Sequence, residues 1–328
     1  MKLASSAVVV AALVIAIVTL GATGGHGAGP NAPKGVRVAV IARGIPLPTS
    51  FAFTPGGKVF VGAADQDCGS YGCGPRGGVY LLRPKASARR VVSVETGAAV
   101  TWSAGRLFVA TSGRVDVHAG FNGRTFARRS TVLTGLPTWV NGIAAGPSGR
   151  IWVTVGGDCD HCVPTAKLAQ AVISIAPDGG EPTIVARRLR QPYGIAFPAR
   201  SSVPLVTVVG QDNLGSDPPP DAIVRATPGS DFGFPTCNWA DGSACAGFAK
   251  PLALLKPHST PTGIAVIGGT AYIGTYGSQA ILRMPVAGSN PKPFVNGFSS
   301  GVVAVGAYGG RLYVGTLSGT IYRVDLSS

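Results

Sequence analysis

The acidic side chains are the first candidates for chemistry, because they are few and unevenly placed. The 328-residue chain has only 14 Asp and Glu residues, and half of them fall in three short segments that each follow an apolar stretch: Asp65, Asp67, Asp158, Asp160, Asp212, Asp217 and Asp221. Carboxylate oxygens are the ligands that a hard cation such as calcium takes. These segments predict a cation site if the fold brings them to one face. Ordinary turn chemistry, which also favours Asp, is the alternative for any single residue.

The six cysteines form three close pairs along the chain, Cys68 with Cys73, Cys159 with Cys162, and Cys237 with Cys245. In an exported protein this spacing predicts three local disulfides. Each would stabilise the fold by roughly 2 kcal/mol through loop entropy. A zinc knuckle or a redox-active pair is the alternative for residues 159–162. No second Cys or His pair has zinc-finger spacing, however, and no helix is expected after the first of these cysteines.

The N-terminal residues 1–29 predict a targeting segment. Lys2 precedes an apolar run from Ala7 to Leu20, which is shorter than the roughly 20 residues that a membrane-spanning helix needs. We expect a signal peptide, with an uncleaved N-terminal anchor as the alternative. Either form predicts a secreted, periplasmic or cell-surface protein that meets a membrane only through such an anchor.

The net charge of +14 raises the question of an acidic partner. The basic residues come in scattered short groups: Arg89 with Arg90, Arg128 with Arg129, and Arg187, Arg188 and Arg190. No long basic run alternates with aromatic residues, so we expect a generally cationic surface and no nucleic-acid partner. We also expect a monomer.

The composition favours an all-β fold. The chain has 48 Gly and 26 Pro, and only 13% of its residues are charged, against about 25% in globular domains, which excludes a helical bundle or coiled coil. An apolar stretch, a Gly-rich turn and a short β-branched or aromatic strand recur six times, at residues 51–63, 100–111, 142–155, 194–209, 263–275 and 302–316.

This repeat predicts a six-bladed β-propeller of four-stranded antiparallel sheets over residues 36–326. A β-sandwich is the alternative. The strand from Val36 to Ala42 has no hairpin partner of its own, so we expect it to complete the last blade and close the ring.

In such a blade, the loops between the second and third strands lie on the same face as the connections between blades. We call this face the polar rim, because the acid-bearing segments fall in those loops. An insertion from Gly229 to Ala249 is expected to leave from the opposite face. The loop from Cys237 to Cys245 is therefore not expected near a site on the polar rim.

Four segments, in matching order, resemble the glucose/sorbosone dehydrogenase family, the soluble quinoprotein sugar dehydrogenases. They are AAGPSGRIWVTVGGDCDHC (144–162), RRLRQPYGIAF (187–197), DNLGSDPPPDAIVRATPGSDFGFPTCNW (212–239), and PHSTPTGIAV together with TYGSQAILRMPV (257–286). The resemblance covers most of residues 45–325. It implies a six-bladed propeller that uses pyrroloquinoline quinone (PQQ) and calcium to accept a hydride from the C1 of a sugar or other small polyol.

The resemblance also implies site residues. Arg190 matches the family's arginine, whose guanidinium suits a cofactor that bears three carboxylates, and Gln191 stands where the family has Asn. Asp212, Asn213 and Asp221 fall in the calcium-side loop, although the spacing before Asp221 is longer than in the family.

One departure from the family concerns the catalytic base. Its histidine corresponds here to Thr138, whose neutral hydroxyl cannot act as a base at pH 7, and general-base catalysis is worth about 10² to 10⁴ in rate. His161 and His258 are the candidates to replace it. The predicted function is therefore an exported quinoprotein sugar dehydrogenase-like protein. The alternatives are a non-catalytic propeller that binds carbohydrate or protein in the same funnel, and a calcium-dependent lactonase, suggested by Asn141 and Asn213.

Overall fold

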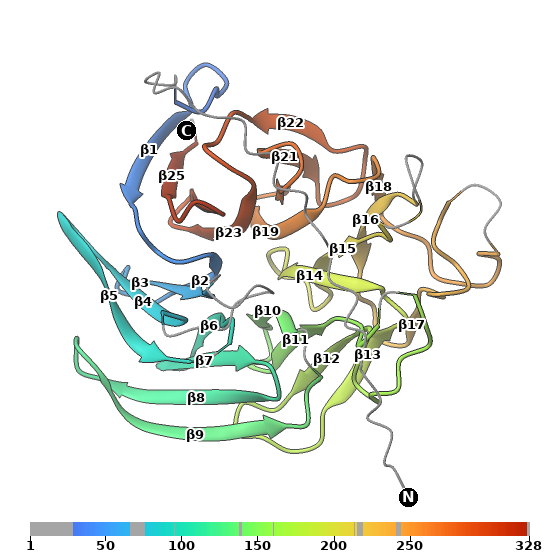
Figure 1. Cartoon of the computed structure of the whole chain (residues 1–328), viewed down its shortest axis with the longest axis horizontal. Helices are drawn as coiled ribbons and strands as arrows, with labels where there is room; N and C mark the ends of the chain where they lie inside the picture. Colours follow the sequence, from blue (N-terminus) through green and yellow to red (C-terminus); the bar gives the residue numbers. More distant parts are fainter. Residues whose placement is uncertain are drawn as a thin grey trace, which may run out of the picture.

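The protein is an all-β ring of sheets (Figure 1). The computed structural model describes residues 29–65, 76–94, 96–137, 140–159, 161–212, 214, 219–240 and 244–326. Within these ranges no helix is long and apolar enough to cross a bilayer. The predicted leader up to residue 28, the pair Cys68 and Cys73, the predicted calcium ligand Asn213 and the base position Thr138 lie outside the described residues.

The strands form six sheets, and each sheet is one blade of a propeller. The innermost strands of blades 1 to 6 are β2 (Pro48–Phe53), β6 (Ala99–Ser103), β10 (Val140–Ala145), β14 (Gln191–Ala196), β19 (Pro261–Ile267) and β23 (Val302–Tyr308). The second strands are β3 (Val59–Ala63), β7 (Arg106–Thr111), β11 (Ile151–Val155), β15 (Leu205–Val209), β20 (Thr270–Thr275) and β24 (Arg311–Thr316). Each inner strand packs against the inner strands of both neighbouring blades, which confirms the predicted six-bladed ring.

The third strands are β4 (Gly78–Arg83), β8 (Arg114–Phe121), β12 (Ala171–Ile175), β16 (Asp221–Arg225), β21 (Ala280–Pro285) and β25 (Ile321–Asp325). The outer strands are β5 (Ala86–Ser93), β9 (Phe126–Thr134), β13 (Thr183–Arg187), β18 (Ala253–Leu255), β22 (Lys292–Val295) and β1 (Arg37–Ala42). Blade 6 contains both ends of the described chain, because β1 pairs antiparallel with β25 and places Arg37 opposite Asp325. The predicted closure of the ring by the N-terminal strand is thus confirmed.

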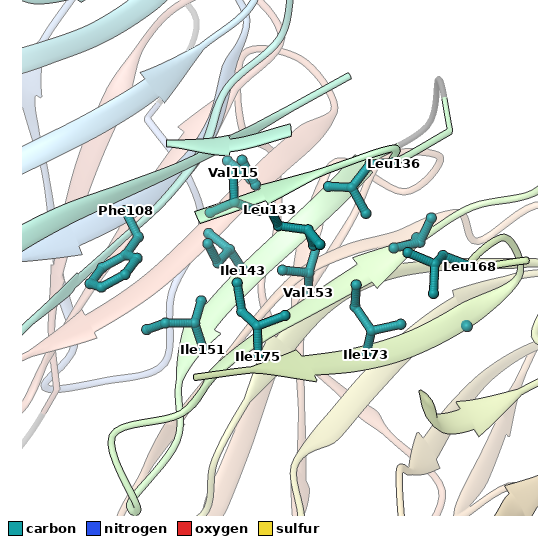
Figure 2. Packing of buried hydrophobic residues seen from close by; sticks show 14 of the residues in the cluster. Phe108, Val115, Leu133, Leu136, Ile143, Ile151, Val153, Leu168, Ile173 and Ile175 are labelled. Carbon is teal, nitrogen blue, oxygen red and sulfur yellow. The ribbon is translucent and has the colours of Figure 1, made fainter. Parts of the chain in front are cut away.

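The apolar cores lie between neighbouring blades. All five residues of β11 and all five of β12 are buried, as expected of strands that are covered on both faces. Figure 2 shows the core between blades 2 and 3, where Phe108, Val115 and Leu133 pack against Ile151 and its neighbours on β11 and β12. The regular spacing of these cores keeps the polar loops at one end of the ring in fixed positions.

Buried threonines join the inner strands near the axis. Thr154 donates a hydrogen bond to the carbonyl of Tyr193 (2.6 Å), Thr207 to that of Thr262 (2.6 Å), and Thr262 to that of Val302 (2.8 Å). The strands also approach closely at glycine: a Cβ on Gly142 would lie 2.3 Å from the carbonyl oxygen of Tyr193. These contacts satisfy carbonyl groups between blades that would otherwise be buried without partners.

The insertion after β16 returns to the polar rim, so the expectation that the loop from Cys237 to Cys245 lies away from this rim is wrong: Cys237 lies beside Arg190 and Gln211. Its short strand β17 (Ser230–Asp231) pairs in parallel with β13, and Ala186 lies opposite Ser230. The chain therefore runs along the outer edge of blade 3, where β17 pairs with part of the open edge of β13. It reaches the polar rim, because the amide of Phe234 donates to the carbonyl of Arg188 (3.1 Å).

Candidate functional site

Three consecutive residues on the polar rim, 210–212, connect most of the predicted site. They directly follow β15, the buried second strand of blade 4. The carbonyl of Gly210 accepts a hydrogen bond from Nη1 of Arg190, and the side chain of Gln211 contacts His161. The side chain of Asp212 faces His258. The structure thus brings residues from blades 3, 4 and 5 together around one short segment.

His161 is held by the amide of Gln211. Its Nδ1 lies 2.7 Å from Oε1 of Gln211, which is buried and 3% exposed. An amide oxygen can only accept, so Nδ1 carries the proton in the neutral ring, and the lone pair of Nε2 is left as a proton acceptor. The edge of the His161 ring also packs against Phe234, with 5.5 Å between ring centroids.

His258 has a weaker, more exposed contact. Its Nδ1 lies 3.5 Å from Oδ1 of Asp212, and 50% of the His258 side chain is exposed against 17% of Asp212. His258 has a positive φ of 57° in the connection that leads to β19. This separation indicates a loose ion pair when the imidazole is protonated rather than a well-formed hydrogen bond.

Asp221 joins two rim segments through hydrogen bonds to their backbone amides. Its Oδ1 accepts the amide of Gly210 and its Oδ2 accepts the amide of Thr260, both at 2.7 Å, and the residue is 1% exposed. Burial raises the pKa of Asp221 to about 6, although the two backbone hydrogen bonds oppose this rise. Because each oxygen accepts a backbone amide, Asp221 ties the 210–212 segment to the connection before β19.

Gln191 lies beside the same segment. It is the first residue of β14 and pairs with Val209. Its side chain passes directly over Gly156, where a Cβ would lie 2.3 Å from Oε1 of Gln191. Glycine at position 156 therefore leaves the space that the Gln191 amide occupies on the polar rim.

A cleft of about 10 Å³, no larger than one water molecule needs, lies between Arg190 and the insertion. Its lining includes Arg190, Gln211, Phe234 and Trp239, and the buried indole nitrogen of Trp239 has no hydrogen-bond partner among the described residues. Gln211 and Phe234 were not singled out from the sequence. The position of Gln211, directly after a buried strand in a rim loop, is the signal that could have found it.

Two of the three predicted disulfides are confirmed. Cys159 is bonded to Cys162 and Cys237 to Cys245, with Cα separations of 6.0 and 4.8 Å. Asp158 and the first pair form the one group of three potential metal ligands in the described ranges, but both sulfur atoms are already bonded to each other. The Oδ2 of Asp158 accepts hydrogen bonds from Thr165, one of them from Oγ1 at 2.7 Å. These bonds hold the pKa of the Asp158 carboxyl below its usual range, so Asp158 organises its own loop.

Comparison with known proteins identifies the fold. No family model and no curated protein sequence matches the chain, whereas many solved structures do. The PQQ-bound aldose sugar dehydrogenase of Streptomyces coelicolor is 20% identical, with a TM-score of 0.71, over 90% of this chain and 99% of that one. A putative glucose dehydrogenase of Thermus thermophilus is 18% identical, with a TM-score of 0.73, over 88% and 100%.

A third solved structure has a similar fold. It is a carbohydrate-active enzyme of family AA12 from Trichoderma reesei, 16% identical with a TM-score of 0.75, over 92% of this chain and 98% of that one. At these identities the likeness is one of fold. The predicted resemblance to soluble PQQ-dependent sugar dehydrogenases is confirmed at that level.

Proposed function

We propose that the protein is a PQQ-dependent sugar dehydrogenase that oxidises the C1 of an aldose or a related polyol. The proposal starts from the shared fold. The observation that carries it is the juxtaposition on the polar rim: the carbonyl of Gly210 binds the cation Arg190, and the next residue, Gln211, holds the imidazole of His161. A cation for an acidic cofactor and a proton acceptor for a sugar hydroxyl are the two groups that this reaction requires.

The side chains around the 210–212 segment include groups that suit a carboxylate-bearing cofactor. The guanidinium of Arg190 supplies positive charge, Gln191 supplies an amide, and the aromatic rings of Phe234 and Trp239 lie close by. The indole nitrogen of Trp239 is buried and has no hydrogen-bond partner among the described residues. Arg190 and Gln191 would hold the quinone, which when bound supplies a two-electron acceptor for the hydride of a sugar C–H bond.

His161 is the proposed general base. With Nδ1 donating to Gln211, its Nε2 would take the proton of the C1 hydroxyl as the hydride leaves. This role would replace the histidine whose position is Thr138. His258, paired loosely with Asp212, would orient substrate hydroxyls on the far side of the 210–212 segment.

Two of the predicted calcium ligands, Asp221 and Asp212, already have protein partners. Both oxygens of Asp221 accept backbone amides, and Asp212 faces His258. No step of the proposed reaction depends on calcium. Of the residues that suggest the lactonase alternative, Asn141 donates from Nδ2 to the carbonyl of Pro192 at 2.8 Å, which fixes its side chain between blades 3 and 4.

Export completes the proposed role. The two disulfides are typical of oxidising compartments, and oxidation of sugars outside the cytoplasm would need no nicotinamide pool. We therefore place the protein at the cell surface, in the periplasm or outside the cell.

Reconstitution tests the proposal. The purified chain is incubated with PQQ, with and without calcium, and reduction of a dye by a panel of aldoses is followed alongside calorimetric binding of PQQ. We expect binding of PQQ and dye reduction, with His161→Gln lowering the rate by about 10² or more if the base role holds.

Lys167→Ala is the matched control, because Lys167 is an exposed cation on the same loop as His161. Its rate should equal that of the wild type. Tight PQQ binding without turnover would identify a non-catalytic propeller instead, and full activity in His161→Gln would remove this histidine from the mechanism.

A further inference from the structure

The outer strands of blades 1 and 2 carry a concentration of positive charge that the proposed reaction does not use. From Arg83 to Arg129 the chain has only two acidic residues, Glu95 and Asp116, against nine basic ones: Arg83, Lys85, Arg89, Arg90, Arg106, Arg114, Arg124, Arg128 and Arg129. All of these basic residues except Arg89 and Arg106 are exposed. They lie at the end of β4, on β5, at the start of β7, on β8 and β9, and in the turns that join β4 to β5 and β8 to β9. Strands β5, β8 and β9 are at the left and lower left of Figure 1. We call this surface the basic flank.

Part of this charge is not neutralised locally. Arg114 and Arg129 share Asp116, with contacts of 2.9 and 2.7 Å, and Arg106 contacts Asp178 at 2.6 Å. In the described ranges Arg83, Lys85 and Arg124 have no carboxylate partner, and neither does Arg128. On blade 3, by contrast, neighbouring arginines are neutralised: Arg187 and Arg188 both bind Asp231 on the insertion.

The basic flank is also continuous and partly ordered. Arg89 of blade 1 donates from Nη2 to the carbonyl of Gly123, in the turn of blade 2 that also carries Arg124. Arg83 donates from Nε to the carbonyl of Ser87 at 2.8 Å. Because hydrogen bonds already restrain these guanidinium groups, a bound anion would cost less side-chain entropy than at free surface arginines.

We propose that the basic flank binds an anionic polysaccharide that carries carboxylate or sulfate groups along its chain. Basic groups without a carboxylate partner, on the outer strand of blade 2 and in the outer turns of blades 1 and 2, match an extended polymer with repeated charges. The site lies on blades 1 and 2, whereas the 210–212 segment and its contacts belong to blades 3, 4 and 5. Polymer binding would therefore hold the protein near acidic glycans while the polar rim stays accessible.

Two other polyanions fit less well. Single-stranded nucleic acid is bound largely by stacking of bases on exposed aromatic rings, but Trp102, Phe121 and Phe126 pack against the apolar core of blades 1 and 2. An anionic bilayer favours exposed apolar side chains beside the basic ones. None of the large exposed hydrophobic residues in the described ranges lies between Arg83 and Arg129.

Binding to alginate, a polymer of uronic acids, tests the proposal. Fluorescently labelled alginate oligomers are titrated with the full chain at 50 to 300 mM NaCl, with neutral dextran oligomers as the uncharged comparison. The triple variant Lys85→Asn, Arg124→Gln, Arg128→Gln removes three basic-flank charges, and Asn suits the positive φ of 54° at position 85. We expect alginate binding to weaken at least tenfold, and the slope of log affinity against log salt to fall by about 2.

The matched control Lys34→Gln, Lys250→Gln, Lys292→Gln removes the same charge from exposed positions elsewhere. It should bind alginate within about twofold of the wild type, and a loss equal to that of the basic-flank variant would overturn the proposal. So would equal binding of dextran and alginate. Tighter binding to single-stranded DNA or to phosphatidylglycerol vesicles than to alginate, lost in the basic-flank variant, would also overturn it by identifying a different polyanion.

Discussion

Nδ1 of His161 lies 2.7 Å from Oε1 of Gln211, and these two residues come from the rim loops of neighbouring blades. The contact fixes which nitrogen of the ring carries the proton. It also places that ring one residue away from the carbonyl that binds Arg190. The proposed site depends on this pair more than on any other contact.

The tautomer of His161 is directly measurable. Long-range ¹H–¹⁵N correlation spectra above pH 8 should show the Nδ1–H form for His161, because the amide oxygen of Gln211 can only accept. In Gln211→Leu this preference should be lost. If the two spectra agree, the amide does not hold the ring.

Asp221 makes the stability of the protein depend on pH. Its folded pKa is about 6 because of burial, against about 3.9 in an unfolded chain. The folded state therefore binds more protons between about pH 4 and pH 6, so this group's contribution is fully present below pH 4 and is lost as the pH rises to 6. The expected loss is about 3 kcal/mol in the free energy of unfolding.

Urea unfolding of the wild type and Asp221→Asn at pH 4.5, 5.5 and 7 measures this contribution. The variant has no titrating group at position 221, so the difference between the two proteins should change across this range. A difference in the free energy of unfolding that stays constant with pH would mean that the pKa of Asp221 is not raised in the folded state.

Gly142 should tolerate no side chain. A Cβ there would lie 2.3 Å from the backbone oxygen of Tyr193, at the contact between blades 3 and 4. Gly142→Ala is expected to lower the free energy of unfolding by about 1 to 3 kcal/mol through overpacking. Gly56→Ala, at a turn where nothing lies within 4 Å, should be neutral or slightly stabilising, and equal effects would argue against close packing at the axis.

Thr207 joins blades 4 and 5. Its hydroxyl donates to the carbonyl of Thr262 (2.6 Å) and accepts the amide of Gly194 (2.7 Å). Thr207→Val would leave both backbone groups buried without a partner, at a cost of roughly 2 kcal/mol or more. Thr183→Val, at an exposed position on β13, is the control and should change stability by less than about 0.5 kcal/mol.

The disulfide between Cys237 and Cys245 holds the insertion at the rim. The sulfur link closes a short loop beside the cleft, and Cys237 is 1% exposed. Cys237→Ser with Cys245→Ser should destabilise the protein by roughly 2 kcal/mol and speed hydrogen exchange at residues 232–240. Exchange at β19, on blade 5, serves as the internal reference and should not change.

The strands, the ring and the cysteine pairs could be predicted because each depends on residues close in sequence or on a simple count. The repeated strand-turn-strand pattern specifies each blade locally, and an unpaired strand at one end implies closure at the other. The shared face of Arg190, His161, Asp212 and His258 could also be predicted, because loops of the same kind in successive blades lie on the same rim.

The roles of single side chains were decided only by the tertiary structure. Asp221 reads as a cation ligand in the sequence, but a backbone amide 39 positions away, at Thr260, takes one of its oxygens. Gln211, which holds His161, is 50 positions away in the sequence. The insertion reaches the polar rim because its strand β17 pairs with the open edge of β13. Local patterns determine which strands form, whereas burial and hydrogen bonding between distant loops determine which polar atoms remain available for chemistry.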